Sequence, residues 1–118
     1  MMAKATLGIG NVDIELDGEI VTLKPTLQAA QAISRQRGGI MAAIRAVGEF
    51  DFDVIVAVIT LGLGATGKEA KEIPDQVYRT GLPDLTAPLI RFLSIIANGG
   101  KPLDNGGSDE DQGNAESR

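Results

Sequence analysis

The chain has 118 residues, enough for one domain, and 43% of them are hydrophobic, an ordinary share for a globular protein. The formal net charge is −5 and aromatic residues make up only 3%, so the chain lacks the positive charge and the stacking rings typical of nucleic-acid binding. It contains no Cys and no His, which excludes disulfides, thiolate metal sites, Cys nucleophiles and a Ser-His-Asp triad. We therefore expect a protein that is not an enzyme, with no cofactor, no metal site and no nucleic-acid partner.

The chain carries no sequence signal for a membrane. Its longest uncharged run, residues 54–67, is shorter than the roughly 20 residues that a membrane-spanning helix needs. No charged n-region followed by an apolar h-region, the pattern of a signal peptide, is visible. We expect no membrane partner and a cytoplasmic location.

The segment from Ala5 to Leu23 predicts a β-hairpin. Apolar residues alternate with acidic ones in the first strand, in the order Val12, Asp13, Ile14, Glu15, Leu16. Asp17-Gly18 favours a two-residue type I′ turn, in which both central residues need a positive φ. Such a turn pairs Leu16 with Glu19 and Val12 with Leu23, which places the apolar side chains on one face.

Two short helices are expected after the hairpin. Thr26 is the expected N-cap of a helix over residues 27–37, because a Thr hydroxyl accepts a hydrogen bond from the first turn. Gly38-Gly39 ends that helix, and apolar residues at helical spacing predict a second one from Ile40 to Gly48. We interpret the cluster of Arg35, Gln36, Arg37 and Arg45 as a solvated helix face.

A third helix is expected through residues 54–61, and Asp51 or Asp53 is its predicted cap. An Asp ahead of an apolar run is most often a helix cap, so we prefer this role to a pair of catalytic carboxylates. The Gly-rich stretch at residues 62–67 is expected to end the helix.

Two further helices complete the predicted domain. Pro74 is expected in the first turn of a short helix that ends at Gly81. The last helix is expected to be capped by Asp84, to hold Pro88 in its opening turn and to end at Gly99-Gly100.

These elements predict an α+β fold, mostly α, with an N-terminal β-hairpin followed by about four to five short helices. We assign residues 1–101 to one domain and residues 102–118 to a disordered acidic C-terminal tail. The tail holds five acidic residues and one Arg, a net charge of −4, and Leu103 is the one large apolar side chain in it. A segment of this composition buries too little apolar surface to offset its ordering entropy.

The segment from Gly62 to Lys68 matches both G-x-G-x-x-G and the phosphate-loop pattern G-x-x-x-x-G-K. The Ser or Thr that should follow the Lys is missing, because position 69 is Glu. Too few residues follow for the additional β–α units of a nucleotide-binding domain. We interpret the segment as a Gly-rich connection between two helices.

The last predicted helix carries an apolar stripe of five residues: Leu85, Leu89, Phe92, Leu93 and Ile96. Such a stripe is most simply part of the core. In so small a domain, part of it can instead form a partner-binding surface or the face of a homo-oligomer. The five residues are therefore the candidate partner-binding site, with the core as the alternative interpretation.

The order of the elements carries a resemblance to a known family. The segments concerned are Asp17-Gly18, Leu23 to Leu27, Val54 to Gly64, Val77 to Leu82, Leu85 to Leu93 and Ala97 to Lys101. In this order the chain resembles the tail assembly chaperones of long-tailed phages, specifically the gene-transfer-agent type found in alphaproteobacterial prophages. The likeness spans residues 12–101 and includes no catalytic signature.

The resemblance implies a protein that binds the tape-measure protein during virion tail assembly and is absent from the mature particle. It implies a role in the cytoplasm of the bacterial host, with the tail-tube protein as a second candidate partner. The alternative function is a small structural tail or connector protein that is retained in the particle. A small regulatory or toxin–antitoxin-like binding module is a third alternative.

Overall fold

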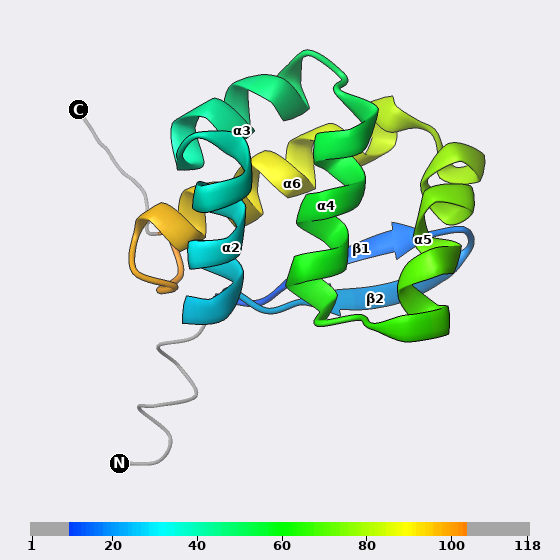
Figure 1. Cartoon of the computed structure of the whole chain (residues 1–118), viewed down its shortest axis with the longest axis horizontal. Coiled ribbons are helices and arrows are strands. Elements are labelled where there is room, and N and C mark those ends of the chain that lie inside the picture. The colour runs from blue at the N-terminus through cyan, green and yellow to red at the C-terminus, as the bar shows by residue number, and fades with distance from the viewer. Residues whose placement is uncertain (1–9, 104–118) are drawn as a thin grey trace.

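The computed structural model describes residues 10–103, which form a two-stranded antiparallel hairpin and five helices (Figure 1). In chain order the elements are β1 (Val12–Leu16), β2 (Glu19–Leu23), α2 (Leu27–Arg37), α3 (Ile40–Gly48), α4 (Phe52–Leu63), α5 (Gly67–Thr80) and α6 (Leu82–Ala97). This is the predicted α+β, mostly α fold. Residues 5–9 of the predicted hairpin and residues 104–118 of the predicted tail lie outside the described residues.

Helices α4 and α6 form the centre of the molecule. α6 contacts α3, α4, α5 and β1, and α4 contacts α2, α3, α5, α6 and β2. Figure 1 shows α2 on one side of α4 and α5 on the other, with the hairpin running across the lower ends of α4 and α5. The core therefore lies around α4 and α6, and the outer helices and the hairpin cover it.

The hairpin has the predicted register and turn. Leu16 pairs with Glu19 and Val12 with Leu23. Asp17 and Gly18 have φ values of 53° and 86°, the two positive values that a type I′ turn requires. The three apolar residues of β1 are buried and its two acids are exposed, so one face of the hairpin joins the core.

Helices α2 and α3 begin and end where the sequence predicts. The Thr26 hydroxyl accepts a hydrogen bond from the Ala29 N–H at 3.0 Å, and Gly38 ends α2 in the left-handed conformation. Helix α3 follows after Gly39 and runs to Gly48.

Helix α4 is capped by Asp51 and continues past the predicted break. The Asp51 carboxylate accepts a hydrogen bond from the Val54 N–H at 3.2 Å, whereas Asp53 lies inside the first turn. The helix includes Gly62. A side chain would not fit at this position, because a Cβ would lie 3.0 Å from Leu23 Cδ2 and 3.1 Å from Phe92 Cζ. Gly62 therefore serves close packing within the helix, and Gly64 is the residue that ends it.

Two predicted helix starts are wrong, and both involve Pro. Helix α5 begins at Gly67, so Pro74 lies in its interior and not in its first turn. Helix α6 begins at Leu82 with Pro83 in its first turn, which places Pro88 in the interior and makes Asp84 a first-turn residue instead of the cap. A Pro inside a helix loses one backbone hydrogen bond, and in both helices buried apolar side chains pack against the core on each side of the Pro.

Candidate functional site

The structure places the predicted apolar stripe of α6 in the core. The exposed fractions are 1% for Leu85, 0% for Leu89, Phe92 and Leu93, and 8% for Ile96. The stripe is covered because α6 is contacted by α3, α4, α5 and β1. Four of the five candidate residues are therefore out of reach of a partner in the folded chain, and a Phe92→Asp substitution would test folding instead of binding.

Ile96 differs from the other four because it reaches the surface. It lines two adjoining hollows that also share Ala30, one of about 440 Å³ and one of about 180 Å³. Together they form a shallow groove between α2, the start of α3 and the end of α6. We call this the α2–α6 groove and define it by its apolar residues Pro25, Leu27, Ala30, Ile40 and Ile96.

Three separate segments form the groove, and a local sequence feature positions each of them. Thr26 caps α2, so Leu27 is the first residue of the helix and Ala30, three positions later, lies on the same face. Ile40 is the first residue of α3. Gly100 closes the end of the groove, where a Cβ would come within 3.0 Å of the Pro25 carbonyl oxygen.

Leu27 is the most exposed apolar side chain of the groove. Its exposed fraction is 73%, whereas Ile40 and Ala30 are half-buried. A large apolar side chain in water is unfavourable by roughly 1.5–3 kcal/mol relative to full burial. Burial of Leu27 against another apolar surface would therefore be favourable.

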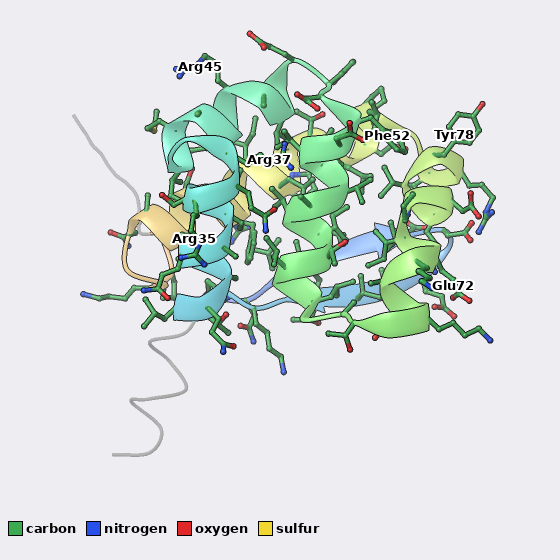
Figure 2. All side chains as sticks on the ribbon, viewed as in Figure 1. Arg35, Arg37, Arg45, Phe52, Glu72 and Tyr78 are labelled. Carbon is green, nitrogen blue, oxygen red and sulfur yellow. The ribbon has the colours of Figure 1, made fainter. Side chains whose placement is uncertain are left out.

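One cation, Arg35, lines the α2–α6 groove, and the segments that form the groove carry no acid. Residues 24–48 contain four cations and no Asp or Glu: the cations are Lys24, Arg35, Arg37 and Arg45. Arg35 is exposed and lines the groove, and Arg37 is half-buried with an Nε that has no hydrogen-bond acceptor among residues 10–103. Figure 2 shows Arg35 and Arg45 at the α2–α3 end of the molecule and Tyr78 at the opposite end, on α5.

Lys24, Arg35, Arg37 and Arg45 form no ion pair with an acid of residues 10–103. Within residues 10–103 the ion pair found joins Arg79 to Asp17 at 2.8 Å, on the far side of the molecule from α2. The predicted solvated face is confirmed for Arg35, Gln36 and Arg45, which are exposed, whereas Arg37 is partly enclosed. An exposed Arg35 without an ion-pair partner favours an acidic residue beside an apolar surface docked there.

A second hollow, of about 600 Å³, lies on the other side of α2, against the end of α4 and the loop after it. The phosphate-loop pattern spans the end of α4, this loop and the start of α5, and the segment before it is helix α4 and not the strand that such a loop follows. Gly64 ends α4 and Gly67 begins α5. The segment does connect two helices, but the connection is shorter than predicted and consists of residues 64–66.

Residues 10–103 contain no group of three or more His, Cys, Asp or Glu side chains placed to hold a metal ion. Over the same range, none of the helices combines the length and the apolar character needed to cross a membrane.

Comparison with known proteins adds no relative: no family model, no curated protein and no solved structure matches the chain. The resemblance to tail assembly chaperones therefore stands as an expectation from the sequence. A function for this chain has to be argued from that resemblance together with the chemistry of the α2–α6 groove.

The sequence contained one usable signal for the groove. Residues 20–48 are the longest acid-free run of the described chain and hold four cations, and this stretch supplies Leu27, Ala30 and Ile40. The meeting of these residues with Ile96 depends on how α2 and α6 each pack against α3, which no local pattern specifies.

Proposed function

We propose that this protein is a tail assembly chaperone that binds the tape-measure protein during assembly of a long phage or gene-transfer-agent tail. The observation that carries the proposal is the α2–α6 groove, a partly exposed apolar surface that is lined at one edge by the exposed cation Arg35. The resemblance in the order of elements supplies the identity of the partner. The proposal places the protein in the cytoplasm of a bacterial host and outside the mature particle.

The groove suits capture of a helix from the partner. An amphipathic helix docks by placing apolar residues three and four positions apart in an apolar groove. Leu27 and Ala30 present such a surface from α2, and Ile40 and Ile96 line the hollow beside it. Acidic residues on the flank of the bound helix would face Arg35, which adds orientation and speed of association.

The modest size of the groove is compatible with release. A chaperone that leaves before the tail is complete must bind tightly enough to prevent aggregation and weakly enough to be displaced by tube subunits. A small interface that buries few large side chains binds weakly, because association costs about 4–15 kcal/mol in lost translational and rotational freedom. Binding of the chaperone to the unfolded or unassembled tape-measure protein then shifts the folding or assembly equilibrium of that partner by mass action.

The test is co-expression of the tagged chain with the large tape-measure-like protein encoded in the same gene cluster. We expect the wild-type chain to make the large protein soluble and to co-purify with it. Leu27→Glu should reduce co-purification at least about tenfold, because it removes the most exposed apolar contact and adds repulsion toward an acidic partner. The substitution should leave the fold intact, since an acid in the first turn of a helix is favourable.

Tyr78→Glu is the matched control. Tyr78 is 79% exposed and lies on α5, at the opposite end of the molecule, so this variant should bind as the wild type does (Figure 2). A tape-measure-like protein that stays insoluble and unbound beside the wild-type chain would contradict the proposal. Recovery of the chain in purified particles would instead support the alternative, a structural tail or connector protein.

A further inference from the structure

Three of the four aromatic side chains lie at the surface of the molecule. Phe92 is buried in the core. Phe50 and Tyr78 have exposed fractions of 48% and 79%, and Phe52 is half-buried. Aromatic rings in contact with water are unfavourable, and surfaces that bind partners are enriched in them. The core therefore does not account for these three residues.

The three side chains lie at one end of the pair formed by α4 and α5. The two helices are in contact, are joined by residues 64–66 and run in opposite directions (Figure 1). Phe52 precedes the last residue of α4 by eleven positions and Tyr78 follows the first residue of α5 by eleven, so each lies about 16 Å from the connection. The Cα atoms of Phe50 and Phe52 are at most about 7 Å apart, because only one residue separates them in the chain. We call Phe50, Phe52 and Tyr78 the aromatic corner, and Figure 2 shows the latter two at the upper right of the molecule.

Phe50 occupies a position at which the fold favours Gly. Its N–H donates to the Val47 carbonyl at 3.0 Å. The next N–H, of Asp51, donates to the Ala46 carbonyl at 3.0 Å, and the two bonds form a Schellman motif at the end of α3. The φ of Phe50 is 63°, in the left-handed region where a bulky residue is strained, and the ring gains no full burial in return. Gly would serve the backbone better here, which points to a use of the ring outside the fold.

The chain around the two Phe residues of the corner is acidic. Residues 46–67 contain three acids and no Lys or Arg, and all three acids are exposed: Glu49, Asp51 and Asp53. Arg45, the cation before this stretch, lies at the α2–α3 end of the molecule (Figure 2). Arg79, beside Tyr78 in the chain, is paired with Asp17. The corner therefore combines exposed rings with negative charge.

We propose that the aromatic corner binds a basic segment of a partner protein. Lys or Arg side chains of that segment lie over the exposed rings of Phe50 and Tyr78, because the face of an aromatic ring attracts a cation and its edge packs against the apolar stem. Their charged ends pair with the carboxylates of Glu49 and Asp53, whereas the Asp51 carboxylate caps α4. Rings and acids together thus select a partner by its positive charge.

The corner and the α2–α6 groove select different partners. The exposed Arg35 of the groove favours an acidic residue on the segment that docks there, and the acids of the corner repel such a segment. The partner at the corner is therefore a second protein, and the inference does not rest on binding of the tape-measure protein. A chain with both surfaces can hold two partners at once.

An NMR titration of the full, isotope-enriched chain with two synthetic peptides is the direct test. Both peptides are short amphipathic helices with the same Leu positions, and the polar positions are Lys in one and Glu in the other. We expect the Lys peptide to shift the amide signals of residues 49–53 and 76–79 at least about threefold more than the Glu peptide does. In 1 M salt, where the Debye length is about 3 Å, the shifts should become smaller.

Substitutions within the corner separate the rings from general attraction to acids. Phe50→Gly and Tyr78→Ser should each weaken binding of the Lys peptide at least about fivefold, whereas Phe50→Tyr should retain it. Ile20→Ser is the matched control, because Ile20 is 68% exposed and pairs with Glu15 across the hairpin but has no ring. This variant should bind as the wild type does. Phe50→Gly should unfold at the same or a higher urea concentration than the wild type, since Gly suits the positive φ.

Four results would overturn the proposal. Two concern the peptides: equal shifts by the Lys and Glu peptides, or unchanged affinity in both Phe50→Gly and Tyr78→Ser. A lower urea midpoint for Phe50→Gly would show that the ring serves the fold. Shifts of residues 49–53 that grow with the concentration of the chain alone would make a second copy the occupant.

This proposal and the proposed function fail in different ways. A wild-type chain that ignores the tape-measure-like protein but binds the Lys peptide at the corner would reject the function and retain the second surface. Capture of the tape-measure-like protein with no preference for the Lys peptide would do the reverse.

Discussion

Asp17, at the tip of the hairpin, is tied to the end of α5. Its N–H donates to the Thr80 hydroxyl at 2.7 Å, and the Arg79 Nε and Nη2 atoms donate to its Oδ2 at 3.1 and 2.8 Å. The hydrogen bonds from Arg79 hold the pKa of Asp17 below its usual value of 3.8. This contact is the one described ion pair among residues 10–103, and it fixes the hairpin against the helix that follows the Gly-rich loop.

The lowered pKa of Asp17 predicts a dependence of stability on pH. A carboxyl group whose pKa is lowered by folding stabilises the native state above its unfolded pKa, and the contribution is lost as the pH falls through the folded value. Between pH 5 and pH 2 the wild type should therefore lose more stability than Asp17→Asn, which keeps a residue suited to the positive φ of 53°. Urea unfolding midpoints of the two proteins measure this, and parallel curves over that range would contradict it.

Gly62→Ala is expected to destabilise the protein, although a Gly-to-Ala change inside a helix usually stabilises it. Ala normally stabilises a helix interior relative to Gly by roughly 0.5–1 kcal/mol. Here the added Cβ would lie 3.0 to 3.1 Å from atoms of Leu23 and Phe92, both fully buried. Gly62→Ala should therefore lower the free energy of unfolding by about 1–3 kcal/mol.

Gly48→Ala is the matched comparison at the end of α3. Its Cβ would have Ile90 Cδ1 as its nearest neighbour, at 4.0 Å, an ordinary contact. This substitution should be neutral or stabilising by up to about 1 kcal/mol. Chemical denaturation of both variants checks the pair, and equal effects at the two positions would show that the packing at Gly62 has been misjudged.

At the scale of single elements, the sequence predicts those features that depend on neighbouring residues, such as turns and helix ends. The turn at Asp17-Gly18 determines the register of the hairpin, and Thr26 and Gly38 determine the ends of α2. The start of α5 escaped prediction because Pro74 disfavours a helix interior locally. Burial of Ile73 and Val77 against the rest of the fold outweighs that cost, and such packing has no local signature.

At the scale of the whole molecule, the candidate site likewise depends on packing that the sequence does not reveal. The spacing of Leu85, Leu89 and Phe92 correctly indicates one apolar face of a helix, but spacing cannot tell whether that face meets water or another element. The contacts of α6 with α3, α4, α5 and β1 decide it in favour of the core. The α2–α6 groove likewise forms where distant segments pack together, so the acid-free stretch points to Leu27, Ala30 and Ile40 but not to their meeting with Ile96.

Phe92 tests the description of the core. Its side chain is fully buried and touches the position of Gly62 on α4. Phe92→Ala should lower the free energy of unfolding by about 3–5 kcal/mol, a large part of the roughly 5–15 kcal/mol typical of a domain. Thermal unfolding followed by circular dichroism measures the loss, and a change below about 1 kcal/mol would be inconsistent with a core centred on α4 and α6.

The central claim, that the α2–α6 groove is where the partner binds, is tested most directly by site-specific photocrosslinking. A photoreactive phenylalanine analogue is placed at Leu27 in one protein and at Tyr78 in another, because both side chains are more than 70% exposed and lie at opposite ends of the molecule. Each protein is co-expressed with the tape-measure-like protein and irradiated. We predict a crosslinked product from position 27 and none from position 78. Crosslinking from position 78 alone would contradict the claim and place the partner on α5.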